Sequence, residues 1–288
     1  MKPQFDNQIM SSLLLWFDHT LLDKGEAYQN TTGQFYNVSA EYAGLDTYSS
    51  SYSQIVSDAS IAGATIPTGL YAGNTLVNVG DGGSSGLYAI DYNNGRSYWS
   101  GDLSVDVTGS FAIKDFNTFL TNSTEDEILF QTQYTNRNKV STVVPTGLEP
   151  GSKTYPVVYL KNDGSYNEPL AFGGQDNTVM KVRAIVIADS QFEIDAIGSL
   201  FRDQRYRNIA IFEASEMPFD QYGYYRNSQY NYTTVTAGKT DAQQMYLEDV
   251  NISRFDRVLE NEVRKFNPNV YSTLIDFEVN KFRFPRQS

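Results

Sequence analysis

Residues 179–201 read VMKVRAIVIADSQFEIDAIGSLF, and they set the pattern for the C-terminal third of the chain. The first half is almost continuously apolar, interrupted only by Lys181 and Arg183, which predicts a buried β-strand. Ser190 and Glu193 then have the spacing of a capping box, in which two side chains satisfy free amides at a helix start. Three apolar residues follow on one helical face: Ile194, Ile197 and Phe201.

The remaining C-terminal residues repeat this pattern. Further strands are predicted at 209–212, 246–252 and 270–282. A second helix begins at Ser253 and stops before Pro268. The order β-α-β, insertion, β-α-β is typical of a ferredoxin-like α/β sandwich with two helices on one face of an antiparallel sheet. The insertion, residues 213–240, is irregular and rich in tyrosine.

Short β-prone runs alternate with turn residues from Thr31 to Pro150. The clearest runs are Gly69–Tyr71, Leu76–Val79, Leu87–Ile90, Leu103–Val107 and Phe116–Leu120. Asn93-Asn94-Gly95 is a strong turn signal and predicts a hairpin. Short strands separated by regularly spaced turn residues favour a sandwich or barrel-like sheet. The polar segment 136–153, with its prolines and glycines, is the expected domain boundary.

These patterns predict an α+β protein with three parts. An amphipathic helix occupies residues 1–28, a β-rich sandwich-like domain 29–150, and an α/β sandwich domain 151–288. The insertion at 213–240 interrupts the last of these.

The N-terminal helix has an unusually broad apolar face. Asp6 can cap its start, and Gly25 can end it. Two interpretations remain open: the helix packs on the core of its own domain, or it docks into a neighbouring subunit. The residues that would make the second contact are Leu14, Trp16, Phe17 and Leu21.

The composition argues against most catalytic chemistry. The chain has 21 tyrosines, one histidine and no cysteine, so it has no thiolate metal site or disulfide. The segment 82–86 matches G-x-S-x-G around Ser84, but the sole histidine, His19, precedes it, and a strand rather than a helix is expected to follow. His19 is more typical of a structural residue near a helix C-terminus. We expect no catalytic residue, no metal and no cofactor.

The net charge of −12 limits the partners. Phosphate backbones are bound by Lys and Arg, so the chain is a poor match for wrapping nucleic acid. An acidic wall would instead suit a channel through which DNA passes without specific binding. No apolar run approaches the ~18 residues of a membrane span, so no membrane partner is expected.

The tyrosines form two clusters. The cluster at 36–52 favours packing within a sheet. The second cluster lies in the insertion, where few aliphatic residues could build a separate core, and it favours contact with a partner. Its members are Tyr222, Tyr224, Tyr225, Tyr230 and Tyr232.

Several stretches together resemble tailed-bacteriophage virion proteins of the head–tail junction and tail. These are the helical start at 5–18, the D-Y-x-x-G-R-x-aromatic hairpin at 91–98, and the stretches 181–189 and 215–219. The resemblance implies a non-enzymatic subunit of a homo-oligomeric ring, in the neck, a head–tail connector or the upper tail. Its partners would be copies of itself and other virion proteins, and it would assemble in the host cytoplasm.

Two alternatives come from other functional classes. One is a carbohydrate-binding adhesin or tail-fibre-like module whose platform is the Tyr222–Tyr232 cluster. The other is a polysaccharide hydrolase, which needs two carboxylates several ångströms apart across a cleft. Candidate carboxylates are Asp102, Asp106, Glu125, Asp126, Glu127, Asp163, Glu168, Glu213 and Glu216.

Overall fold

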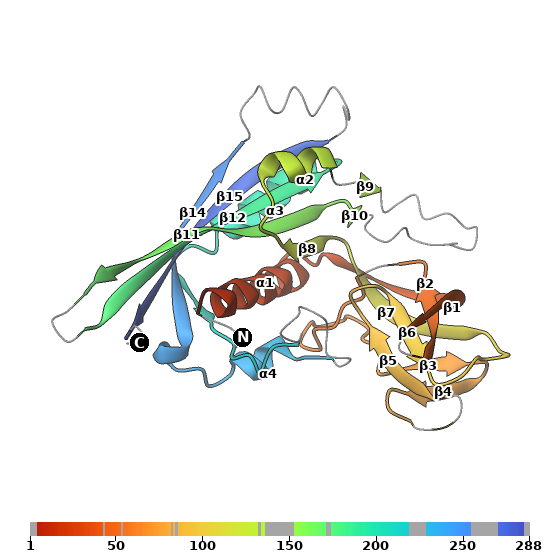
Figure 1. The fold of residues 1–288 in the computed structure, drawn as a ribbon. Helices are drawn as coiled ribbons and strands as arrows, with labels where there is room; N and C mark the ends of the chain where they lie inside the picture. Colours follow the sequence, from red (N-terminus) through yellow and green to blue (C-terminus); the bar gives the residue numbers. More distant parts are fainter. Residues whose placement is uncertain are drawn as a thin grey trace.

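The protein is a mixed α+β structure with one long N-terminal helix and two curled sheets (Figure 1). The computed structural model describes residues 5–42, 44–52, 54–81, 83, 86–131, 134–135, 153–170, 174–218, 229–254 and 270–284. The smaller of the two main sheets lies at one end of the molecule, and a long β-hairpin extends from the other end.

The smaller body is a seven-stranded antiparallel sheet in the order β4-β3-β7-β1-β2-β6-β5. Its strands are β1 (Tyr28–Tyr42), β2 (Leu45–Ser50), β3 (Gly69–Ala72), β4 (Thr75–Asn78), β5 (Leu87–Asp91), β6 (Arg96–Trp99) and β7 (Val107–Lys114). The sheet curls around a core that includes Phe35, Trp99 and Phe111. The Gly80 amide donates to the Leu87 carbonyl at 2.9 Å, which brings the two edges of the curl together. The predicted β-rich region is therefore confirmed.

One local prediction in this sheet is confirmed and one is wrong. The hairpin at Asn93-Asn94-Gly95 joins β5 and β6, with Gly95 at φ +62°. The predicted strand Leu103–Val107 does not form, because β7 begins only at Val107. The Tyr48 hydroxyl accepts from the Leu103 amide at 2.9 Å, so a side chain takes the place of a neighbouring strand.

The larger body is a six-stranded sheet in the order β13-β14-β15-β12-β11-β8. Its strands are β8 (Asn117–Leu120), β11 (Val157–Pro169), β12 (Asp176–Ala188), β13 (Arg207–Ala210), β14 (Gln244–Ser253) and β15 (Tyr271–Arg283). The strand and helix predicted from residues 179–201 are confirmed as β12 and α3 (Gln191–Arg202). The Ser190 hydroxyl caps α3 by accepting from the Phe192 amide at 3.2 Å.

The ferredoxin-like topology is not confirmed. A split β-α-β unit requires the strands on either side of its helix to be parallel. Here β12 and β13 are separated by three antiparallel pairings in succession, which leaves them antiparallel. The second predicted helix, at 253–266, lies almost entirely outside the described residues.

Helices cover both faces of the large sheet, but unequally. On the inner face lie α1 (Phe5–Asp23) and α3, and they share one apolar core with the sheet. Trp16, Phe17, Phe201 and Phe277 form an aromatic cluster there, with Phe17 stacked on Phe201 at 3.8 Å. The short helix α2 (Glu125–Gln131) lies on the opposite, outer face (Figure 1).

The predicted domain boundaries differ from the bodies that the structure forms. The helix α1 is part of the large sheet's core rather than a separate unit, and β8 pairs in parallel with β11. The smaller body therefore ends at β7, near Lys114, and the chain joins the large sheet from Asn117. The expected boundary segment 136–153 lies outside the described residues apart from the start of β10 (Lys153–Thr154), which pairs with β9 (Tyr134–Thr135).

Candidate interaction surface

Strand alternation divides the large sheet into two faces of different character. On β15, Ile275, Phe277 and Val279 point into the core with α1 and α3. The intervening residues point to the outer face, where α2 covers one half of the sheet. There Ile128 packs on Ile185 and its neighbours. No described helix lies over the other half of the outer face, away from α2, although Val179 there is buried between its neighbours.

We call this open half the distal face, and it carries exposed aromatic side chains. Cross-strand partners Tyr166, Val179, Asn280, Tyr246 and Asn208 form one row across five strands. Tyr166 is 47% exposed and Tyr246 is 38% exposed. Isolated exposed apolar residues are normal on protein surfaces, but rings gathered on one uncovered sheet face indicate an interaction site.

Tyr206 extends the distal face beyond β13. Its ring stacks on that of Tyr246 with centroids 6.5 Å apart, and it is 59% exposed. The Arg205 guanidinium lies 4.4 Å from the Tyr206 ring centre and also pairs with Asp249 at 3.0 Å. Tyr206 has φ +65°, a left-handed conformation that is unusual for a bulky residue, and its amide donates to the Leu247 carbonyl at 2.9 Å at the start of β13.

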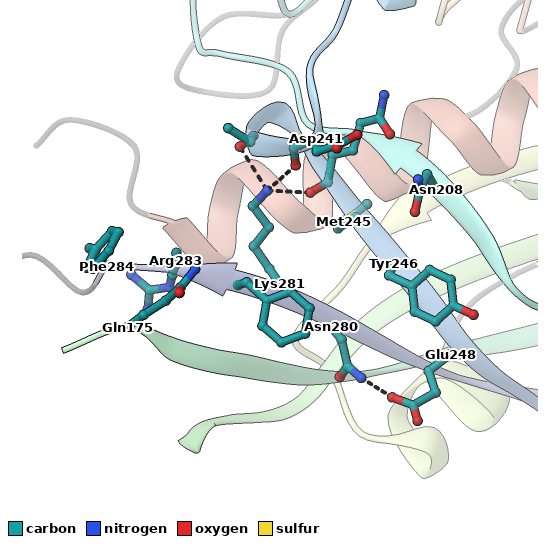
Figure 2. Close-up of a pocket in the computed structure, with 13 residues that line it drawn as sticks. Gln175, Asn208, Asp241, Met245, Tyr246, Glu248, Asn280, Lys281, Arg283 and Phe284 are labelled. Carbon is teal, nitrogen blue, oxygen red and sulfur yellow. Dashed lines mark hydrogen bonds between the residues drawn. The ribbon is translucent and has the colours of Figure 1, made fainter. Parts of the chain in front are cut away.

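A groove opens where β14 and β15 diverge. Their first register pair is Tyr246 with Asn280, although β14 begins at Gln244 and β15 continues to Arg283. The resulting fork encloses about 950 Å³. Its lining residues, shown in Figure 2, are Gln175, Asn208, Asp241, Ala242, Gln244, Met245, Tyr246, Glu248, Asn280, Lys281, Phe282, Arg283 and Phe284.

Lys281 holds the two sides of the fork together. Its Nζ donates to the backbone carbonyls of Asp241, Ala242 and Gln244 at 2.5–2.9 Å (Figure 2). Burial lowers the pKa of this ammonium group, and the nearby Asp241 carboxylate partly offsets the effect. Because all three donor positions of the ammonium are used, Lys281 acts as a structural clamp rather than as a free cation.

A charged cluster separates the distal face from the half that α2 covers. Arg183 Nε donates to Asp276 Oδ1 at 2.7 Å, and its Nη1 donates to Glu125 Oε1 at 2.9 Å. Asp163 approaches the same guanidinium at 3.7 Å. Two of the candidate hydrolase carboxylates, Glu125 and Asp163, therefore serve to pair an arginine.

The single histidine has a structural role, as predicted. His19 Nδ1 lies 2.7 Å from Asp58 Oδ2, and its ring stacks on Tyr232 at 4.1 Å. Asp58 is fully buried and also accepts from the amides of Ser60 and Tyr232. Burial raises the pKa of Asp58, but these hydrogen bonds outweigh it, so the pKa lies below its usual value. This cluster joins α1, the β2–β3 connection and the insertion.

The structure assigns most of the predicted interface residues to the interior. Trp16, Phe17 and Leu21 are at most 7% exposed and Leu14 is half-buried, so the helix packs on its own domain and the docking interpretation is corrected. The reason is that the large sheet already covers the apolar face of α1.

The structure describes two members of the Tyr222–Tyr232 cluster. Tyr232 is buried against His19, and Tyr230 is half-buried where its strand bridge meets Asp58. Both therefore contact other residues of this chain. Tyr222, Tyr224 and Tyr225 lie outside the described residues, as does Ser84.

The distal-face residues were missed by the sequence reasoning. Tyr166, Tyr206, Tyr246 and Phe282 are spread over four segments and have no common motif. The available signal was an aromatic ring at the polar phase of an alternating strand, as with Phe282 beside Lys281.

The described residues contain no group of three or more His, Cys, Asp or Glu positioned to hold a metal ion. In the same part of the chain, no helix is long and apolar enough to cross a membrane. No protein-family model matches the chain, and no curated protein matches it either.

Proposed function

We propose that the protein is a non-enzymatic structural subunit of a tailed-phage virion, which forms a homo-oligomeric ring in the neck, head–tail connector or upper tail. The observation that carries the proposal is the distal face: an uncovered half-sheet bearing exposed Tyr166, Tyr246 and Phe282. Aromatic residues are enriched at the cores of protein interfaces.

The titratable groups that pair with one another inside the fold support a structural rather than a catalytic role. Asp18 and Lys114 form a buried pair at 2.8 Å, and His19 is held by Asp58. Lys239 is likewise bound to Glu216. Each of these groups joins two segments of the fold instead of facing an open cleft, which is where catalytic acids and bases are placed.

The phage assignment rests on the sequence resemblance and not on the fold. The resembling stretches at 5–18 and 91–98 form α1 and the β5–β6 hairpin. Both elements contribute to cores, α1 to the large one and the hairpin to the small one, so a family that keeps them would keep both cores. The acidic net charge of −12 would suit a ring through which DNA passes.

The test is the mass of the purified protein by light scattering, together with its presence in particles imaged by cryo-microscopy. We expect a defined oligomer of the chain and its incorporation into virions. The double variant Tyr246→Ser and Phe282→Ser should weaken the oligomer. Phe192→Ser is the matched control, because Phe192 is 81% exposed on α3. A protein that stays monomeric and never joins particles would refute the proposal.

A carbohydrate-binding module is the second candidate, and the stacked pair Tyr206–Tyr246 favours it. Stacked exposed rings beside a mainly apolar groove, to which Asn208 and Glu248 add polar groups, are suited to the apolar faces and hydroxyls of a sugar. A glycan array tests this: specific hits that vanish on Tyr206→Ala but persist on Tyr88→Ala would establish it. Tyr88 is the control because it is also 59% exposed but lies on the smaller sheet.

A further inference from the structure

The distal half of the large sheet has a free edge on each side. β8 pairs with β11 only along Val157–Leu160, so the rest of β11 has no partner on that side in the described chain. At the opposite end of the strand order, the described residues give β13 a single neighbour, β14. Unpaired edges are templates for strand addition, and proteins usually protect them.

The edge of β11 is open over a short window. A register shift between Asn162 and Gly164 limits it on one side, and Pro169, which has no amide hydrogen, limits it on the other. Leu170 donates its amide to the Gln175 carbonyl at 3.0 Å. Because ladder bonds alternate along an antiparallel strand, the amides of Ser165 and Asn167 point away from β12.

The edge of β13 also has backbone groups that point away from the sheet. Ile211 donates its amide to the Gln243 carbonyl at 2.8 Å, so Ile209 and Arg207 bond toward β14. The alternation then directs the backbone groups of Asn208 and Ala210 outward. β13 is four residues long, and the window Ser165–Glu168 on β11 has the same length.

The two edges lie at the same level and run in the same direction. Tyr166 and Asn208 are the two ends of the row that crosses the distal face. Four antiparallel pairings separate β11 from β13, so these strands are parallel to each other. A second copy in the same orientation can therefore place its β13 beside β11 and continue the sheet.

The exposed charges near the two edges are of opposite sign in excess. Around β13, Arg202, Arg205 and Arg207 are exposed beside Asp203, and Arg205 also pairs with Asp249. The β11 arm carries exposed Asp163 and Glu168, of which Asp163 also approaches Arg183 at 3.7 Å. Charge complementarity of this kind sets the partner and the register of an interface.

The aromatic residues lie near the same edges. Tyr166 stands at the β11 edge, and the Tyr206–Tyr246 stack stands beside β13. A head-to-tail seam would bring Tyr166 of one copy toward the stack of the next and cover rings that are otherwise exposed.

We propose that the β11 edge at Ser165–Glu168 of one copy pairs in parallel with the β13 edge of a second copy of this chain, forming a head-to-tail seam. A head-to-tail contact closes into a ring when its rotation permits. This inference rests on the proposed ring function, for which it supplies the interface and the partner surface.

Proline variants of the intact chain test the seam. Asn167→Pro removes an outward amide from the β11 edge, and Asn208→Pro removes one from the β13 edge. We expect each variant to be monomeric by light scattering. Asn167→Ala and Asn208→Ala keep the amides and should assemble as the wild type does. Circular dichroism verifies that each variant is folded.

Mixing the two proline variants gives the sharper result. Each retains one intact edge, and the intact edges are complementary, so an equimolar mixture should yield one-to-one dimers and nothing larger. A symmetric β11–β11 contact predicts instead that Asn208→Pro alone still dimerises. That outcome, or the absence of dimers from the mixture of folded variants, would overturn the proposal.

A charge variant avoids the risk of misfolding. Arg207→Glu places a negative charge opposite the acidic arm and should raise the dissociation constant of the assembly at least tenfold at low salt. Lys24→Glu is the control, because it makes the same charge change on a residue whose side chain is 58% exposed at the end of α1. Equal effects of the two variants would argue against the seam.

Failure of the seam and failure of the ring function give different results. If the proline variants assemble like the wild type, the ring function stands and the interface lies elsewhere. If the wild type is monomeric at every concentration and absent from particles, the ring function itself fails.

Discussion

Replacing Asp58 by alanine should uncouple segments from three parts of the chain. Asp58 is fully buried and accepts from His19 Nδ1 at 2.7 Å, from the Ser60 amide and hydroxyl at 2.9 and 2.7 Å, and from the Tyr232 amide at 3.0 Å. Alanine leaves these donors without an acceptor, and each unsatisfied buried donor costs about 1–3 kcal/mol. Partial access of water to Ser60 reduces the sum, so we expect a loss of about 4 kcal/mol in the free energy of unfolding.

Urea denaturation at pH 7, followed by tryptophan fluorescence, measures this loss. The two tryptophans report on different cores, since Trp16 lies in the large one and Trp99 in the small one. Measuring Asp58→Ala in Trp16→Phe and Trp99→Phe backgrounds shows whether both bodies lose stability together. We expect both transitions to shift, because Asp58 connects α1 to the β2–β3 connection of the smaller body.

Asp58→Asn is the matched control. Its carbonyl can replace Oδ1, which accepts the three bonds from Ser60 and Tyr232. Its amide can donate to a neutral His19, so the loss should be only about 1–2 kcal/mol. If Asp58→Ala costs less than about 1 kcal/mol, or no more than Asp58→Asn, the reasoning is refuted.

The same carboxylate predicts the direction of the pH dependence. The pKa of Asp58 is lowered in the folded state from its ordinary value of 3.8, because its hydrogen bonds outweigh the effect of burial. The unfolded chain therefore binds the proton more tightly, and this contribution is present above pH 3.8 and is lost as the pH falls below it. Asp58→Asn should show a smaller loss of stability over that acid range, measured by urea titration at each pH.

Three further substitutions follow from individual contacts. Trp16→Ala should lower the free energy of unfolding by about 3–5 kcal/mol, because it leaves a cavity in the large core, and the shift of the urea midpoint measures this loss. Gly95→Ala should destabilise the small body by about 1–3 kcal/mol, because its φ is +62° and a Cβ would collide with the Tyr52 carbonyl; a thermal melt that matches the wild type would contradict this. Lys114→Met should lower the free energy of unfolding by about 3–5 kcal/mol, because it leaves the buried Asp18 carboxylate without its cation. Adding Asp18→Leu should recover much of this loss. A double variant less stable than the single one would argue against this reasoning.

Helices and hairpins were predicted well where a capping or turn residue marked their ends. Ser190 and the apolar face after it gave α3, and the turn residues at Gly95 gave the β5–β6 hairpin. Leu103–Val107 misled because alternation alone does not show whether a neighbouring strand is present, and here the Tyr48 hydroxyl bonds to that backbone. The ferredoxin-like topology was not confirmed because the order of strands depends on long-range pairing, which periodicity does not encode.

The candidate surface could not be predicted for a similar reason. Tyr166, Tyr206 and Tyr246 lie in three separate segments of the sequence. Strand register brings Tyr166 and Tyr246 to one face, and the Tyr206 ring stacks on Tyr246. Tyr232 and Trp16 are of the residue types that are common at interfaces, but the fold buries both. Tyr232 packs against His19, and Trp16 packs in the core of the large sheet. Whether an aromatic residue is buried or offered to a partner depends on what else packs there.

The amino-acid sequence is sufficient for the α+β class, for α1, α3 and most strands, and for the structural role of the lone histidine. These follow from local periodicity, capping and turn chemistry, which act over a few residues. The pairing of β15 between β12 and β14, the burial of α1 and the two free edges of the distal half-sheet come from the assembled fold. They depend on contacts between segments 100 or more residues apart, such as Asp18 with Thr118 and Ser12 with Phe212, which form only when the sheet and helices pack together.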